Sequence, residues 1–351
     1  MAFDDLFQIP IIQGPMAGGA CTPELVAAVS NAGALGSLPC SLLSPATIEA
    51  QVARIRALTE RPFLLNFFVQ GTPAPSEAEV ERAVELLRPV WSSLGWDSLP
   101  LPNQWCEDFA AQFETLLKLR PAAVSFTFNI LEAVQVERLH GAGIAVIGTV
   151  TTVAEALAWQ AIGADAVVAS GVEAGGHRGT FIGRQEDATL SSRALWPAVA
   201  AAVTIPVIAA GGIMSGADIK QALQLGARAV QMGTAFLVTD EAATHPAHRA
   251  RILSGEGRTR LTRSFSGRYA RGIENGFMRQ MEAVEAQVPP YPVQNALTGP
   301  IRAAAAKSGD TDLMSMWAGA EFARARAMPA ARLIEVLATE LASELASEVQ
   351  T

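Results

Sequence analysis

The run Glu173-Ala-Gly-Gly-His-Arg-Gly179 sets one histidine inside a glycine-rich stretch. Imidazole can act as a general base near neutral pH, or donate a hydrogen bond to an anionic substrate. The stretch directly follows Ala166–Ser170, an apolar run that predicts a buried strand. Because catalytic groups are often carried on loops that a rigid scaffold positions, we predict His177 as a catalytic residue. The alternative is a histidine that only holds its loop to a carbonyl group.

Glycines also stand at the ends of two further apolar runs. Gly211–Gly212 follows Val207–Ala210, and the run Ala229–Met232 continues into Gly233-Thr234. Glycine lets the backbone come close to a ligand, and exposed backbone N–H groups can hold a phosphate. We therefore predict a phosphate-bearing cofactor at two adjacent strand ends. The alternative is that Gly211–Gly212 only makes a tight turn.

Four stretches share one pattern, in which a helical segment is followed by glycine and then by an apolar run. They are Asn31–Leu35, Gly141–Ile147, Gly163–Val168 and Gly226–Gln231. Glycine just past a helix accepts the left-handed conformation that ends it. The apolar runs suit parallel strands that are covered on both faces. Thr152 with Glu155, and Ser215 with Asp218, have the spacing of capping boxes or a near variant, which predicts helix starts there.

The chain contains eight predicted strands in all. They lie near Ile9–Gln13, Ala34–Ser37, Phe63–Phe68, Ala123–Phe126, Ala145–Val150, Ala166–Ser170, Val207–Ala210 and Ala229–Met232. Eight strands alternating with helices favour an α/β fold of the (β/α)8 TIM barrel type over an open doubly wound sheet. Active sites of such barrels lie at the C-terminal ends of the strands. The three glycine-bearing segments all fall at that end.

Two regions do not follow the alternation, and we expect them to form a smaller inserted lid or substrate lobe. They are residues 70–118, with three tryptophans, and residues 241–300. Long insertions after barrel strands usually cover the catalytic face. The barrel domain is then predicted to comprise residues 1–69, 119–240 and 301–351. Within it, the alanine-rich stretches 301–306 and 318–348 predict closing helices.

One uncharged stretch, Trp196–Met214, has the hydropathy of a membrane span. Pro197, Pro206 and the pair Gly211–Gly212 are expected to divide it into a short helix, a turn and a strand. It is better interpreted as buried barrel sequence. The acidic N-terminus lacks the basic and apolar regions of a signal peptide, and we expect a cytoplasmic protein.

The composition argues against several classes of partner. A net charge of -8 disfavours nucleic acid and anionic membrane surfaces. The three cysteines form no CxxC motif, so neither a zinc site nor a disulfide framework is expected. His245 and His248 lack nearby carboxylates, so we interpret them as surface-loop residues and predict no metal. No GxSxG motif is present, and no GxGxxG follows a strand, which excludes a Rossmann nicotinamide site.

Taken together, the strand ends resemble the nitronate monooxygenase family, formerly called 2-nitropropane dioxygenases, and in particular its bacterial class I. The match covers Ile11–Met16, Thr22–Leu25 through Ser30–Gly33, Asn66, Pro121–Phe126, Glu173–Gly179, Ala209–Met214, Gln231–Phe236, Ser266–Arg268 and Trp317–Gly319. The resemblance implies a TIM barrel with noncovalent FMN. It also implies oxidation of alkyl nitronates, such as propionate 3-nitronate, by molecular oxygen. The oligomeric state is left open.

The resemblance also implies roles for individual residues. His177 would face the substrate nitro group, and would act as the base if a neutral nitroalkane is used. The substrate pocket would include Tyr291, Asn295 and Ser266. The expected FMN contacts are Gln13, Pro15, Met16, Asn66, Ser170, Gly175, Gly176, Gly211, Gly212, Gln231, Met232, Gly233 and Thr234.

Four positions depart from the family pattern. Ser170 stands where the family often has a flavin-contacting Gln, and Ala320 replaces the Gln that follows Trp-Ala-Gly. In the motif that begins at Tyr291, a Tyr is expected where Asn295 stands and a Lys where Gly299 stands. The last two changes remove a phenol and a cation from the expected substrate pocket, so the substrate itself is left open.

Two other functions remain open on the sequence. One is an FMN-dependent NAD(P)H reductase, of the enoyl-acyl-carrier-protein reductase or quinone reductase type, which shares the barrel and the Glu-Ala-Gly-Gly-His loop. The matches at Pro121–Phe126 and Ser266–Arg268 favour the monooxygenase. The other is a non-catalytic flavin-binding module that has kept the barrel and lost its chemistry.

Overall fold

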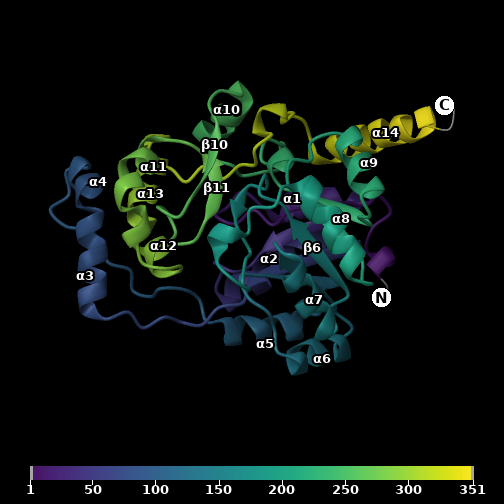
Figure 1. Ribbon diagram of the computed structural model, residues 1–351, viewed down its shortest axis with the longest axis horizontal. Helices are drawn as coiled ribbons and strands as arrows, with labels where there is room; N and C mark the ends of the chain where they lie inside the picture. The colour runs from purple at the N-terminus through teal and green to yellow at the C-terminus, as the bar shows by residue number, and fades with distance from the viewer. Residues whose placement is uncertain (1–2, 349–351) are drawn as a thin grey trace.

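The computed structural model describes residues 3–348, and an eight-stranded parallel sheet forms its centre (Figure 1). The sheet has the order β1-β9-β8-β6-β5-β4-β3-β2. A parallel bridge between Ile12 and Leu35 joins the two end strands and closes the sheet into a barrel. The strands are β1 (Ile11–Gln13), β2 (Gly36–Pro39), β3 (Phe63–Phe68), β4 (Ala123–Thr127), β5 (Ala145–Val150), β6 (Ala166–Ser170), β8 (Val207–Ala210) and β9 (Ala229–Met232).

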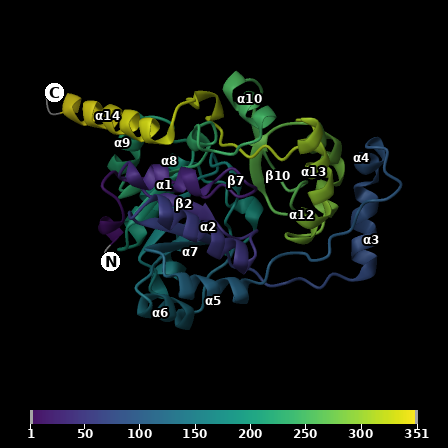
Figure 2. The same cartoon turned by 180° about the vertical axis from the view of Figure 1, so that it is seen from behind.

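Helices surround the barrel, as the alternating pattern predicts (Figures 1 and 2). The last of them packs against α9 and α1, which completes the ring. The predicted (β/α)8 TIM barrel is therefore confirmed, and the open doubly wound sheet is wrong. The surrounding helices are α1 (Pro23–Asn31), α2 (Pro45–Leu58), α5 (Phe109–Leu119), α6 (Ala133–Gly141), α7 (Val153–Ala161), α8 (Ser192–Ala202), α9 (Gly216–Gln224) and α14 (Ala330–Glu348).

The local signals for helix starts and ends are realised in the structure. Thr152 and Ser215 cap α7 and α9, each in a reciprocal capping box with the acid three residues later. The glycines that follow α1, α6, α7 and α9 have positive φ angles between 78° and 94°. Such angles are favourable only for glycine. These glycines therefore mark where four of the barrel strands, β2, β5, β6 and β9, can begin.

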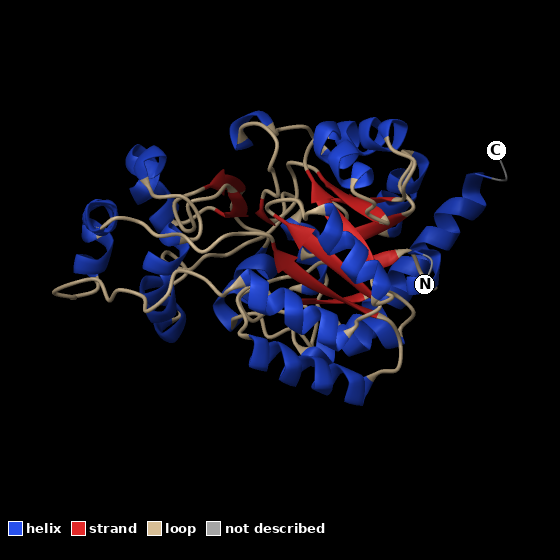
Figure 3. Ribbon diagram, turned by 90° about the horizontal axis from the view of Figure 1, so that it is seen from below, coloured by secondary structure: helices blue, strands red, loops and turns tan. Residues whose placement is uncertain are grey.

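A second lobe lies beside the barrel, on the side toward which the barrel strands point (Figure 3). It has its own buried cluster of apolar side chains, separate from that of the barrel. It also holds a small antiparallel sheet of order β10-β11-β7. Its elements are α3 (Glu77–Leu86), α4 (Arg88–Ser93), α10 (Pro246–Ser254), α11 (Gly276–Met281), α12 (Val293–Leu297), α13 (Gly299–Ser308), β7 (Gly176–His177), β10 (Thr259–Thr262) and β11 (Ala270–Ile273).

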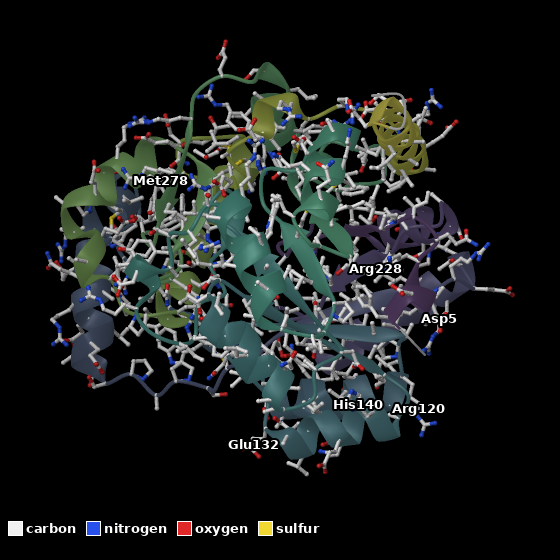
Figure 4. The ribbon with its side chains drawn as sticks, turned by 45° about the vertical axis from the view of Figure 1, so that its right-hand side comes forward. Asp5, Arg120, Glu132, His140, Arg228 and Met278 are labelled. Atoms are coloured by element: carbon white, nitrogen blue, oxygen red, sulfur yellow. The ribbon has the colours of Figure 1, made fainter. Side chains whose placement is uncertain are left out.

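Figure 4 illustrates the separation of the two lobes. Met278 on α11 lies in the second lobe, while Arg228 and Asp5 lie at the far side of the barrel.

The remaining short segments among residues 3–348 are five 3₁₀ helices. They are η1 (Phe3–Leu6), η2 (Gln185–Asp187), η3 (Thr234–Phe236), η4 (Glu282–Gln287) and η5 (Phe322–Arg324).

Several expected boundaries differ in the structure. Residues 109–118, expected in the lid, form most of α5, whose Phe113 and Leu116 pack in the barrel core. The apolar side chains between Ile301 and Phe322 pack instead in the cluster of the second lobe. The exact limits of the two domains therefore stay a proposal.

The predicted closing helix 318–348 begins only at Ala330, because residues 317–320 contact the barrel mouth and Pro329 precedes the helix. Strand β2 begins two residues later than expected, since Leu35 makes the bridge that closes the barrel. Pro197 does not divide its stretch as expected but lies inside α8. Within residues 3–348, no helix is both long and apolar enough to cross a membrane.

Close packing between strand and helix gives a test of the barrel. A Cβ atom at Gly148 on β5 would lie 2.3 Å from the ring of Trp159 on α7, and Trp159 is completely buried. We expect Gly148→Ala to destabilise the protein by about 1–3 kcal/mol, because the core cannot accept the extra methyl group. Urea unfolding followed by circular dichroism would measure the loss.

Gly141→Ala is the matched control. Gly141 ends α6, and an added Cβ there meets no atom within 4 Å. We expect this variant to be neutral or slightly more stable. Equal stability of the two variants would contradict the packing described for β5 and α7.

Candidate active site

A cavity of about 540 Å³ opens at the C-terminal ends of the barrel strands, between the barrel and the second lobe. Most of the residues predicted from the sequence line it. They are Pro15, Met16, Asn66, Ser170, Gly175, Gly176, His177, Gly211, Gly212, Gln231, Met232, Gly233, Thr234, Tyr291 and Asn295. Gln13 and Ser266 lie outside this lining.

The glycines after β8 and β9 leave backbone donors free at one side of the cavity. Gly211 and Gly212 have φ angles of 113° and 75°, which side-chain-bearing residues rarely adopt. Among residues 3–348, no acceptor receives a hydrogen bond from the backbone N–H of Gly212, Gly233 or Thr234. Free N–H groups on adjacent strand ends form a concave site suited to an anion. We call these three residues with Gly211 the glycine cradle.

The ends of β1 and β3 contribute the neighbouring wall. Asn66 donates through Nδ2 to Ser125 Oγ at 2.9 Å, while its Oδ1 has no protein partner within the described chain. Gln13 is fully buried beneath the cavity, where its Oε1 accepts from the backbone of Ser37 at 2.9 Å and its Nε2 contacts Cys21. Gln13 thus holds the loop after β1 from below. Its direct contact with a cofactor stays a prediction.

His177 lies on a strand rather than on a free loop. Gly176 and His177 form β7, which pairs antiparallel with Ala270 and Arg271 of β11. The sequence shows only a glycine-rich stretch, because its strand partner lies more than 90 residues away. This pairing fixes the imidazole at the edge of the second lobe, facing the barrel mouth.

The hydrogen bonds of Ser266 determine which imidazole nitrogen carries the proton. Ser266 Oγ lies 3.0 Å from the carbonyl of Arg268, which can only accept, and 2.9 Å from His177 Nε2. The Ser266 hydroxyl therefore donates its proton to the Arg268 carbonyl. The Nε2–H of the neutral imidazole then donates to Ser266 Oγ. The Nδ1 atom, without a partner in the described residues, keeps its lone pair.

Charged side chains hold the loop around His177 by contacts with its backbone. Arg178 donates to the carbonyls of Ser170, Gly171 and Ala188, at 2.6–3.1 Å. Arg268 donates to the carbonyls of Arg178 and Thr180. Glu173 does not face the cavity, since its carboxylate accepts from the backbone and hydroxyl of Ser192 at 2.7 Å. The loop is thus rigid on both sides of the histidine.

The loop that carries His177 also packs closely against the segment Trp317–Ala320. A Cβ at Gly175 would lie 2.5 Å from the backbone nitrogen of Gly319, so only glycine allows this approach. The backbone nitrogen of Ala320 donates to the Glu173 carbonyl at 2.9 Å. The Ala320 side chain itself is exposed and does not line the cavity. This departure from the expected pattern therefore lies outside the cavity lining.

Aromatic rings surround the imidazole. The rings of Trp317 and Tyr291 have centroids 5.4 Å and 5.6 Å from that of His177. Burial lowers the pKa of His177 to about 3, and the nearby positive charges of Arg268 and Arg302 act in the same direction. Burial also raises the pKa of Tyr291. At neutral pH the site therefore presents a neutral imidazole and a neutral phenol.

Sequence reasoning missed Arg302, which lines the cavity from α13. Its signal was a single arginine near the start of an alanine-rich helix, three residues after the Gly299 departure. Asn295 also lines the cavity, and its Oδ1 accepts from Arg302 Nη2 at 3.1 Å. The structure thus places a cation in the cavity wall beside Asn295.

The interpretation of His245 and His248 as surface-loop residues is wrong. Both line the cavity together with Thr244, because the chain from Ala243 to α10 packs beside the loop after β1. The atoms His248 Nε2 and Thr244 Oγ1 are buried without a hydrogen-bond partner. No group of three or more candidate metal ligands was found among residues 3–348.

Comparison with known proteins places the chain in a family. The sequence model described as "Nitronate monooxygenase" matches residues 2–340. A protein of Bacillus subtilis named "Probable nitronate monooxygenase" is 42% identical over 322 residues, which cover 88% of this chain and 89% of the relative. The chain belongs to the nitronate monooxygenase family. A relative of the same name from Staphylococcus haemolyticus is 41% identical, over 89% of this chain and 88% of its own length.

Solved structures agree with this membership of the nitronate monooxygenase family. The structure of a nitroalkane oxidase from Streptomyces ansochromogenes has a TM-score of 0.90 and 42% identity, covering 98% of both chains. A structure of FabK from Thermotoga maritima has a TM-score of 0.76 and 27% identity, over 99% of this chain and 97% of that one. The prediction of an oxidoreductase family is confirmed.

The buried histidines make stability depend on pH. Burial lowers the pKa of His177 to about 3 and that of His248 to about 4. In the unfolded chain both titrate near about 6.5, so between that pH and about 4 the unfolded state binds more protons. Stability is therefore present above pH 6.5 and lost as pH falls through this window. At pH 5 each histidine costs up to about 2 kcal/mol relative to pH 7.

We expect His248→Gln to remove one of these two contributions, so that the fall in unfolding free energy between pH 7 and pH 5 becomes smaller. Urea unfolding of the ligand-free protein at both pH values measures it. An identical fall in the wild type and the variant would contradict the burial of a neutral His248.

Proposed function

We propose that this chain binds FMN noncovalently and oxidises alkyl nitronates, of the propionate 3-nitronate type, with molecular oxygen. The observation that carries the proposal is a neutral His177, with a free Nδ1, held in the same cavity as a glycine cradle of free backbone N–H groups. The cradle suits a phosphate, and the imidazole suits an anionic nitro group. Family membership supports the same activity.

Gly233 supports the placement of the cofactor phosphate. Its φ angle is -98°, so the backbone does not require glycine there. An added Cβ would meet only Met16 Cγ, at 3.8 Å, so packing does not require glycine either. A glycine that neither conformation nor packing demands is explained by the close approach of a ligand. The residues present therefore fit a phosphate-bearing group in the glycine cradle.

The remaining FMN contacts follow from the lining of the cavity. Asn66 Oδ1 and the backbone around Ser170 and Met16 would contact the ring system, and Gly175 and Gly176 would lie beside it. Bound FMN would supply the electron acceptor for the nitronate and return the electrons to oxygen. The part of the cavity wall that FMN would leave uncovered, at His177, Tyr291 and Asn295, would then hold the substrate.

His177 contributes by binding and by proton transfer. A nitronate beside the imidazole favours its protonated form, since opposite charges raise the pKa of the base. Nδ1–H then donates a hydrogen bond to the nitronate oxygen, while Nε2–H stays on Ser266. With a pKa near about 3 in the free site, His177 is a weak base for a neutral nitroalkane. The geometry therefore favours the preformed nitronate as substrate.

The second candidate is an FMN-dependent NAD(P)H reductase. It is supported by the likeness to FabK, which has lower identity and a lower TM-score than the likeness to the nitroalkane oxidase. The non-catalytic flavin-binding module is disfavoured by the oriented imidazole, because a binding module needs no unpartnered Nδ1 at the cavity wall.

An anaerobic stopped-flow experiment tests the activity. We expect propionate 3-nitronate to bleach the flavin absorbance of the loaded protein within the enzyme's turnover time, while NADH and NADPH leave it unchanged on that timescale. His177→Asn should lower kcat/KM for the nitronate by about 10²–10⁴-fold, since one positioned acid–base group is removed. The variant should remain yellow.

Ser266→Ala is the control for the orientation of the imidazole, and we expect a smaller loss than in His177→Asn. Fast bleaching by NADH together with slow bleaching by nitronate would establish the reductase instead. No turnover with either reductant would favour the binding module.

Gly233→Ala tests the placement of the phosphate. The added methyl group would make only an ordinary van der Waals contact, with Met16 Cγ at 3.8 Å, so we expect unfolding of the cofactor-free protein to be unchanged. The FMN Kd should rise by about tenfold or more, equivalent to about 1.4 kcal/mol. Fluorescence titration with FMN measures it, with Gly141→Ala as the control. An unchanged Kd would remove the phosphate from the glycine cradle.

A further inference from the structure

Arg302 is the one lysine or arginine among the cavity-lining residues of the described chain. It lies in the first turns of α13. Its Nη2 donates to the backbone carbonyl of Asn295 at 2.7 Å and to Asn295 Oδ1 at 3.1 Å, while Nε donates to Thr298 Oγ1 at 3.3 Å. These three contacts fix the guanidinium plane and leave Nη1 without a partner among residues 3–348.

Arg302 lacks a counter-ion among the described residues, where it takes part in no ion pair with an aspartate or glutamate. Burial lowers the pKa of Arg302 to about 10, so the side chain is still charged at neutral pH. A charge removed from water without a counter-ion is unfavourable, and an anion entering the cavity would relieve that cost.

The other buried arginines of the site do not resemble Arg302. Arg178 and Arg268 direct their guanidinium groups at backbone carbonyls and do not line the cavity. Their positive charges serve to hold the His177 loop. Arg302 alone among these three lines the space where a substrate would lie.

Arg302 is connected to His177 through the residues of α12 and the turn before it. Tyr291 contacts the imidazole with a ring-centroid distance of 5.6 Å, and Asn295 follows one helical turn later. Asn295 then binds Arg302 directly. The imidazole and the guanidinium are therefore two separate positions on one wall of the cavity, with the phenol between them.

Gly299 lies one turn before Arg302 on α13 and also lines the cavity. The resemblance described above implies a lysine at this position. An added Cβ at Gly299 meets no atom within 4 Å, so nothing in the protein excludes a side chain there. Arg302 lies three residues further, on the same face of the helix. Arg302 thus places a cation one turn after the position where the resemblance implies a lysine.

We propose that Arg302 binds a second anionic group of the substrate, a carboxylate, and so determines specificity for carboxylate-bearing nitronates over uncharged alkyl nitronates. The inference rests on the proposed function, in which His177 binds the nitro group. A guanidinium held in one plane can receive a carboxylate through charge-assisted hydrogen bonds. Asn295 acts as the positioning residue for this cation.

The test compares two nitronates that differ in the carboxylate, propionate 3-nitronate and butyl 1-nitronate. We expect Arg302→Met to lower kcat/KM for propionate 3-nitronate by about 10- to 100-fold, as for loss of a charge-assisted contact. The value for butyl 1-nitronate should change by less than about threefold. Arg302→Lys should lie between the wild type and Arg302→Met.

A relocation variant strengthens the test. Gly299→Lys combined with Arg302→Met returns a cation to the family position, and should restore part of the lost preference for propionate 3-nitronate. Gly299→Ala combined with Arg302→Met is the matched control and should restore none. Thermal unfolding of all the variants, followed by circular dichroism, verifies that each one is folded.

Binding without turnover separates this inference from the proposed function. Calorimetry with malonate as an inert carboxylate probe, on the flavin-loaded protein, should show at least tenfold weaker binding in Arg302→Met. That result supports the inference even if neither nitronate is oxidised, an outcome that would overturn only the proposed function. Equal losses on both nitronates, or unchanged values on both together with unchanged malonate binding, would overturn the role of Arg302.

Discussion

The antiparallel pairing of β7 with β11 is the contact on which the candidate site depends. It attaches a two-residue strand from the loop after β6 of the barrel to a hairpin of the second lobe. The parallel barrel alone leaves that loop free at its C-terminal face. The pairing makes His177 part of a sheet, and the Ser266 hydroxyl from the same lobe then orients its ring. Two lobes are therefore needed to position the His177 imidazole.

The buried arginines near the cavity fall into two groups, those that hold the His177 loop and Arg302, which lines the cavity. The guanidinium groups of Arg178, Arg268 and Arg271 are used on backbone carbonyls of the loop that carries His177. This arrangement satisfies carbonyls that a closely packed loop would otherwise leave without donors. Besides burial, the positive charge of Arg268 favours a neutral His177 imidazole, because it lowers the pKa of that side chain. Because these cations are engaged, an anion in the cavity finds its free donors at the glycine cradle and at Arg302.

Three of the polar positions in the cavity differ in their chemistry. The glycine cradle offers backbone dipoles, His177 offers a nitrogen whose protonation responds to an anion, and Arg302 offers a fixed charge. Aromatic and apolar side chains separate them. Electrostatic contacts are stronger in such water-poor surroundings than in solvent. This separation suits a cofactor phosphate at the glycine cradle and an anionic substrate at His177 and Arg302.

Much of the barrel could be predicted from the sequence because its signals are local. Capping boxes at Thr152 and Ser215, glycines that end helices, and uniformly apolar runs each act within about ten residues. The glycine cradle could be predicted for the same reason, since it follows directly from two strand ends. The boundaries near Leu35 and before Ala330 could not be predicted, because contacts distant in the sequence decide them.

The sequence by itself therefore determined the alternation of strands and helices, the residues at the strand ends and the family. Only the tertiary structure decided that His177 lies on a strand, that its proton is on Nε2, and that His248 and Arg302 line the cavity. These features arise from pairing and packing between segments tens of residues apart or more. No local pattern of residue types encodes such pairings, because the closing of the second lobe over the barrel creates them.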